Sequence, residues 1–132
     1  MLSTFDAPLV LAVLLVGLGG CKRAEAVSDA FALEASLVRA MTAPRGTRLV
    51  ESGEVNYQQL RVSQEWRVEP HGLWPEYSAA VTRALASYRC SSDTAELRCS
   101  RSSPGDYFQL SLTLESGSSP PAVRARFEAR PD

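Results

Sequence analysis

The sequence predicts an α+β fold: an antiparallel meander sheet of about four to five strands, one main packed helix, and a further helix near the N-terminus. Two observations lead to this prediction. Several segments alternate apolar and polar residues with the period of two that marks a half-buried strand. One segment repeats apolar residues at the spacing of a helix face. The chain after residue 27, about 100 residues, is long enough for one domain with its own core, and we expect that domain to span residues 28–132.

The N-terminal helix is predicted from a capping residue and a helical stripe. Ser28 can cap a helix that runs from Asp29 to Met41, and the Pro44-Arg45-Gly46 segment ends it. Residues 22–27 are polar and small, so we expect a short tether there. A weaker strand is predicted over Thr47 to Glu51.

The central strand is the clearest in the chain. From Leu60 to Glu69, apolar residues recur at every second position, and only Gln64 interrupts the apolar face. The Pro70-His71-Gly72 segment ends this strand.

The main helix follows, because Pro75 can open a helix whose first turn does not need its missing N–H. Between Pro75 and Tyr88 the apolar residues form one stripe. Three more alternating segments predict strands over Glu96 to Arg101, Asp106 to Glu115 and Ala122 to Arg130. Their alternation predicts an antiparallel sheet with one face exposed to solvent.

The N-terminal segment contains an apolar run, Pro8 to Val16, followed by Leu18-Gly19-Gly20-Cys21. An apolar run of this length followed by small residues is typical of a secretory signal and is too short to span a bilayer stably. The sequence resembles a bacterial lipoprotein precursor, with Leu18 to Cys21 as its lipobox. The leading residues Met1 to Asp6 contain no Lys or Arg, so either the true start lies upstream of Met1 or the signal is an unusual one.

The resemblance implies a signal peptide over residues 1–20, a lipidated tether over residues 21–27, and acylation of Cys21. Acyl chains then hold the domain on a lipid bilayer. In Gram-negative lipoproteins an Asp after the Cys commonly retains the protein in the inner membrane. The residue here is Lys22, so the resemblance favours the outer membrane, facing the periplasm. The alternative from the residues is a core helix with Cys21 as a buried thiol.

The remaining cysteines, Cys90 and Cys99, predict a disulfide bond. An extracytoplasmic compartment permits one, and two thiols remain once Cys21 is committed. A hairpin in which Cys90 faces Cys99 has the right spacing. The alternatives are two buried free thiols or, with the lone His71, an incomplete zinc ligand set.

The overall charge argues against a nucleic-acid partner and against an electrostatically held membrane patch. The chain has 14 basic and 15 acidic residues, and Asp6 is the one charged residue lost when residues 1–20 are removed. A nearly neutral domain lacks the basic footprint of a nucleic-acid-binding protein.

The residues indicate no catalytic motif, metal or cofactor. Ser78, His71 and Asp93 could form a triad only on paper, without a G-x-S-x-G elbow. The protein is therefore predicted to be a non-catalytic accessory or interaction module of the cell envelope, with an unknown protein partner. The candidate interaction residues are Trp66, Trp74, Tyr77, Arg124, Arg126 and Arg130. Core packing is the alternative for the aromatic residues, and a solvated face is the alternative for the arginines. The alternative function is a small-ligand or peptide pocket between helix and sheet.

Overall fold

The computed structural model describes residues 19–115, 117 and 121–131, with side chains from residue 29 onward. The signal peptide predicted over residues 1–20 therefore lies almost entirely outside the described residues, and the Cys21 side chain lies outside them too. The chain divides into two compact units with the boundary after Leu33. The fold below is that of the second unit, which begins at Glu34.

Helix α2 has the bounds Gly19–Met41, so it begins ten residues before the predicted start at Asp29. The residues predicted as a tether include Lys22, Arg23, Ala24, Glu25 and Ala26, which have high helix propensity. Their polarity suggested a tether, but their backbone preference favours a helix. Among the described residues, none of the helices combines the length and the apolar character that crossing a membrane requires.

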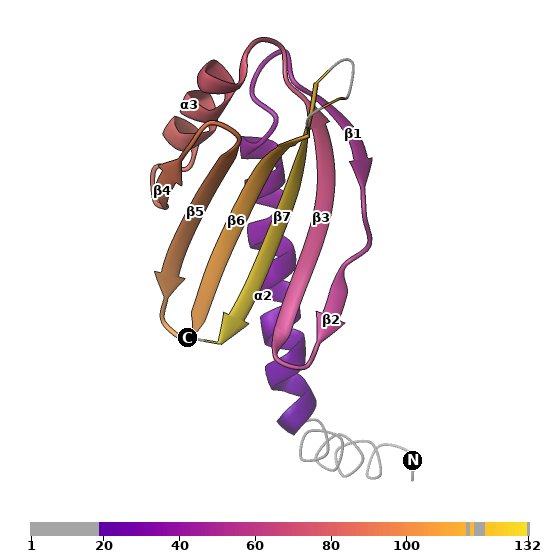
Figure 1. Ribbon diagram of the computed structural model, residues 1–132. Helices are drawn as coiled ribbons and strands as arrows, with labels where there is room; N and C mark the ends of the chain where they lie inside the picture. The colour runs from indigo at the N-terminus through magenta and orange to yellow at the C-terminus, as the bar shows by residue number, and fades with distance from the viewer. Residues whose placement is uncertain (1–18, 116, 118–120, 132) are drawn as a thin grey trace, which may run out of the picture. The chain divides into compact units, whose positions relative to one another are not determined.

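The sheet has seven strands, all paired antiparallel, which confirms an α+β fold but exceeds the four to five strands predicted (Figure 1). Their bounds are β1 Arg48–Ser52, β2 Asn56–Gln58, β3 Arg61–Glu69, β4 Arg89–Ser92, β5 Glu96–Ser103, β6 Asp106–Glu115 and β7 Ala122–Pro131. Strand β2 was not predicted. It is three residues long and fully exposed, so it has no alternating pattern and exists through its backbone pairing with β3.

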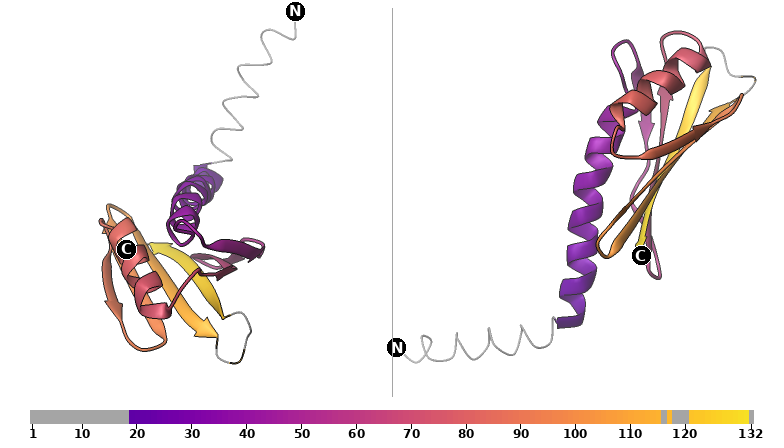
Figure 2. Two further views of the ribbon diagram at one scale, coloured as in Figure 1. Left: turned by 90° about the horizontal axis from the view of Figure 1, so that it is seen from above. Right: turned by 90° about the vertical axis from the view of Figure 1, so that its left-hand side faces the viewer.

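The strand order β1-β3-β7-β6-β5-β4 differs from a simple meander. Strands β4 to β7 do follow one another, but β3 pairs with the last strand, β7. Helix α3, Trp74–Ala84, carries the chain from β3 to the opposite edge of the sheet, where β4 lies. Strands β5, β6 and β7 then fill the sheet from β4 back to β3. Figure 2 shows the sheet nearly edge-on as a single twisted layer.

The core lies on one face of this sheet. The alternating residues of β3, β6 and β7 meet in register there: Trp66 lies opposite Ala125, and Leu110 lies opposite Phe127. Phe108 and Phe127 stack with ring centroids 5.9 Å apart. Gln64, which interrupts the apolar face, is buried and donates a hydrogen bond of 2.9 Å to the carbonyl oxygen of Gly53. It thereby satisfies the backbone of the loop between β1 and β2.

Helix α3 begins one residue before Pro75, close to the prediction, but it ends at Ala84 instead of Tyr88. The chain leaves the helix because β4 must pair with β5, with Cys90 directly opposite Cys99. Leu85 and Tyr88 stay buried although they lie outside the helix. The amide of Tyr88 donates to the Leu85 carbonyl oxygen at 2.9 Å, which closes the turn.

The predicted disulfide between Cys90 and Cys99 is confirmed. It closes a short ring, with a sequence separation of nine residues, at the edge of the sheet. By loop-closure entropy, opening this ring costs about 2.5 kcal/mol. We therefore expect a Cys90→Ala/Cys99→Ala variant to lose about that much free energy of unfolding in denaturant titrations, and the native protein to lose it on adding reductant. Equal stability of the oxidised and reduced proteins would contradict this expectation.

Candidate functional site

The outer face of the sheet, opposite the core, carries the three predicted arginines. Arg124, Arg126 and Arg130 alternate along β7 with the buried residues Val123, Ala125, Phe127 and Ala129. This is the alternation that the sequence predicts, because the hydrophobic set of a strand can face only one side. The arginines therefore lie on a solvated surface.

Carboxylates neutralise most of the arginines on this outer face. Glu115 accepts two hydrogen bonds from Arg67, at 3.1 and 2.8 Å, and lies 3.6 Å from Arg124. Arg67 and Arg124 are direct neighbours in the register of β3 and β7, so Glu115 relieves the repulsion between two adjacent cations. Arg48 pairs with Glu69 at 3.1 Å and Arg126 with Glu128 at 3.9 Å. Much of this face is thus charged but locally balanced.

Arg61 and Arg130 form an exception at one end of the face. Within the described part of the chain, neither makes an ion pair with a carboxylate, and the guanidinium of Arg130 lies over the ring of Tyr107, 4.7 Å from its centroid. Together they border a hollow of about 480 Å³, whose lining residues are Gln58, Gln59, Leu60, Arg61, Arg130 and Pro131. Two cations without a carboxylate partner in the described residues therefore border this hollow.

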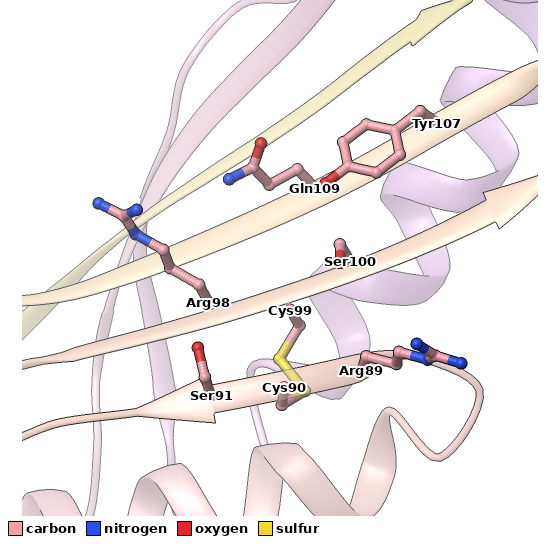
Figure 3. A pocket seen from close by; sticks show the side chains of 8 residues that line it. All are labelled: Arg89, Cys90, Ser91, Arg98, Cys99, Ser100, Tyr107 and Gln109. Carbon is pink, nitrogen blue, oxygen red and sulfur yellow. A yellow bond between two sulfur atoms is a disulfide. The ribbon is translucent and has the colours of Figure 1, made fainter. Parts of the chain in front are cut away.

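A second hollow, of about 340 Å³, lies beside the disulfide and is lined by residues of β4, β5 and β6 (Figure 3). Arg89 and Arg98 both line it, and their side chains point in opposite directions. Arg98 also makes a hydrogen bond to Glu96. Two cations that do not converge on one point do not form an anion site, so this hollow carries no argument for one.

The predicted aromatic residues lie in the core, not beside the arginines. Trp66 and Tyr77 are 1% and 4% exposed, and Trp74 is 9% exposed. Their polar atoms are also used internally: Trp66 Nε1 donates to Thr42 Oγ1 at 2.9 Å, Tyr77 donates to the Thr42 carbonyl oxygen at 2.6 Å, and Trp74 Nε1 donates to the Asp93 carbonyl oxygen at 3.1 Å. This is the core-packing alternative, and a pocket between helix and sheet would need the space that these rings fill.

Burial raises the pKa of the Tyr77 hydroxyl well above its usual value near 10, and burial together with the hydrogen bond to Glu34 does the same for Tyr88. A raised tyrosine pKa means that the unfolded chain ionises first as the pH rises. The stabilisation is complete below pH 10 and is lost above it. We expect the free energy of unfolding to fall above about pH 10, with a shallower slope in Tyr77→Phe and Tyr88→Phe variants. Slopes identical to that of the native protein would contradict this.

A polar cluster that the sequence did not predict lies on the core side of the sheet. Arg101 of β5 points inward and lies 2.9 Å from Glu34 of α2, and Tyr88 donates to the same carboxylate oxygen at 2.6 Å. The Arg101 guanidinium lies 5.6 Å from the centroid of Tyr88 and 5.1 Å from that of Phe108. The alternation of β5 was a usable signal, because it places Arg101 on the same face as Leu97 and Cys99.

The residues of the hypothetical triad each have a local structural role. The Ser78 hydroxyl donates to the Pro75 carbonyl oxygen at 3.2 Å, and an Asp93 carboxylate oxygen accepts the backbone N–H groups of Ala95 and Glu96, both at 2.9 Å. His71 lies against Gly46, where an added Cβ would approach the His71 Cβ to 3.0 Å. Among the residues described, no group of three or more His, Cys, Asp or Glu side chains could hold a metal ion.

Comparison of the chain with protein-family models, curated proteins and solved structures finds no match. The candidate site is therefore interpreted from its own residues. It consists of the outer sheet face with Arg124, Arg126 and Arg130, bounded at one end by the hollow beside Arg61.

Proposed function

We propose that this protein is a lipid-anchored module of a bacterial cell envelope, held on the outer membrane by acylated Cys21 and facing the periplasm. The observation that carries the proposal is the Leu18-Gly19-Gly20-Cys21 sequence after an apolar run. Its small residues and its cysteine are what signal cleavage and acylation need. The Cys90–Cys99 disulfide supports the compartment, because disulfides persist in oxidising environments such as the periplasm.

The anchor is tested by feeding the bacterial host a fatty acid that carries a chemical handle. The native chain should take up the label, and a Cys21→Ser variant should take up none. The matched control is Cys90→Ala/Cys99→Ala, which removes the other two cysteines and keeps the label. A native chain without label, or a labelled Cys21→Ser variant, would refute the anchor.

We further propose that the anchored domain is non-catalytic and binds an envelope protein through its outer sheet face. The support is the exposure of Arg124 and Arg126, whose side chains are 61% and 55% accessible. Exposed arginines can bind a protein surface whose charges are complementary to theirs, and they can steer that surface toward the correct orientation.

A photo-crosslinking residue placed at Arg126 tests the interaction in living cells. We expect an adduct of one discrete mass, which disappears when Arg124 is changed to Glu in the same chain. The control position is Leu73, a 70% exposed residue at the start of α3 and away from the outer face. The absence of any adduct from position 126, or an equal adduct from position 73, would count against this surface.

A further inference from the structure

The direction in which the chain enters the second unit can be read from contacts within that unit. Thr42 contacts Trp66, near the middle of β3, whereas Glu34 contacts Arg101. Arg101 pairs with Phe108, Phe108 with Ala129, and Ala129 with Val62, at the start of β3. Residues 42 to 34 thus lead back toward the end of the sheet where β3 begins and β7 ends. We call this the Leu60 end, after the exposed residue in the turn between β2 and β3.

The distance between this end and the anchor is limited by the chain. Twelve residues lie between Cys21 and Glu34, a distance of thirteen steps along the chain. They span about 20 Å as a helix and at most about 45 Å fully extended. The opposite end of the sheet, at Glu69 and Glu115, lies seven or more residues farther along the strands, about 23 Å beyond the Leu60 end. With acylated Cys21 in a bilayer, the Leu60 end is therefore the end of the sheet within easier reach of the lipid surface.

The chemistry of the Leu60 end matches such a surface. The Leu60 side chain is 73% exposed, and the hollow of about 480 Å³ beside it is bordered by Arg61 and Arg130. Neither of these arginines has a carboxylate partner in the described residues, whereas Arg48, Arg67, Arg124 and Arg126 do. Arg130 also stacks on Tyr107, and tyrosine is enriched at membrane–water interfaces. Asp106, paired in register with Pro131, is an acid at this end among the described residues.

The turn at this end carries a conformational cost. Gln58 pairs with Arg61, so Gln59 and Leu60 form a two-residue hairpin connection. Turns of this kind favour glycine where φ is positive, and Gln59 has a φ of 55°. A residue with a Cβ is less favourable at this position than glycine.

From these observations we propose that the Leu60 end docks on the anionic phospholipid surface of the bilayer that holds Cys21. Leu60 enters the interface, and Arg61 and Arg130 contact lipid phosphates. This inference rests on the proposed anchor. Each arginine near an anionic surface is worth about a fivefold change in binding, so the contact orients an anchored domain but does not hold a free one. The outer sheet face then stands beside the bilayer and is open to a partner in the periplasm.

The test uses the mature lipoprotein with its acylated Cys21, reconstituted into vesicles of phosphatidylcholine with or without phosphatidylglycerol. A fluorescent probe is attached in a Leu60→Cys variant and, as the matched control, in a Leu73→Cys variant. The two leucines are equally exposed, 73% and 70%, but Leu60 precedes β3 and Leu73 follows it. Quenching by nitroxide-labelled lipid reports contact with the bilayer.

We expect quenching at position 60 only in vesicles that contain phosphatidylglycerol, and none at position 73. Arg61→Gln and Arg130→Gln should each lower the docked-to-undocked ratio about fivefold, and Asp106→Asn should raise this ratio. High salt should abolish the difference in quenching between vesicles with and without phosphatidylglycerol. Equal quenching at both positions, in protein that stays on the vesicles, would overturn docking and leave the anchor intact. If the probe at position 60 is shielded from solvent in native membranes but not in vesicles, the Leu60 end binds a protein and lipid docking is overturned. A chain that carries no acyl group would overturn the anchor and the docking together.

Discussion

A chain without its acyl anchor should leave the membrane. If residues 1–20 are replaced by an ordinary secretory signal and Cys21 by Ser, we expect practically all of the protein in the soluble fraction of the envelope. The reason is that acyl chains supply the binding, about 0.8 kcal/mol for each buried methylene, and one chain alone binds only marginally. The domain itself, with equal numbers of acidic and basic residues after residue 20, adds little attraction.

The matched control keeps the foreign apolar segment but ends it in Leu18-Gly19-Gly20-Cys21. This chain should return to the membrane fraction, because the lipobox and not the apolar run directs acylation. Release of both chains, or membrane retention of both, would contradict the role given to Cys21.

The second large effect concerns the Glu34–Arg101 pair inside the second unit. A Glu34→Leu variant leaves a mostly buried guanidinium without its carboxylate and the Tyr88 hydroxyl without its acceptor. Removing one partner of a buried ion pair costs several kcal/mol of unfolding free energy. Because the Glu34 and Arg101 side chains keep 17% and 27% of their exposure, we expect a cost of about 3 kcal/mol. Denaturant unfolding at pH 7 measures this loss.

The double variant Glu34→Leu/Arg101→Met separates pairing from packing. Apolar residues of similar volume can replace a buried ion pair at little cost, so we expect the double variant to lie within about 1 kcal/mol of the native protein. The control is Glu128→Gln, which breaks a longer ion pair of 3.9 Å whose arginine is 55% exposed, and which should cost less than about 0.5 kcal/mol. A single variant as stable as the native protein, or a double variant as unstable as the single, would contradict this account.

The parts of the fold that depend on local pattern were predictable. The period of two in β3, β6 and β7 gave their bounds to within a residue. The buried sets match the predicted faces except at Leu60, which was predicted on the apolar face of the central strand but lies in the turn before β3 and is 73% exposed. Pro75 marked the start of α3. The Cys90–Cys99 bond followed from compartment and spacing, and the structure confirms it.

The parts that depend on long-range pairing were not predictable. Strand β2 has no buried residue to reveal it, and its pairing partner β3 decides its state. The insertion of β7 beside β3 joins segments about 60 residues apart, and alternation says nothing about neighbours. Glu34 and Arg101 read as ordinary charged residues in the sequence, because a helix and a distant strand bring them together.

The candidate site divides in the same way. The exposure of Arg124, Arg126 and Arg130 follows from the alternation of β7. The burial of Trp66, Trp74 and Tyr77 depends on how α3 packs, and both alternatives were open in the sequence. The hollow beside Arg61 depends on the turn at Gln59. This turn was not predicted because it has no glycine to mark it.

The most direct test of the central claim is the intact mass of the protein purified from the membranes of its own host, with and without reductant. The account predicts a chain that begins at Cys21 and carries acyl groups, and that gains the mass of two hydrogens when the Cys90–Cys99 bond is reduced. An unmodified chain that retains Met1 would contradict the anchor, the compartment and the docking of the Leu60 end.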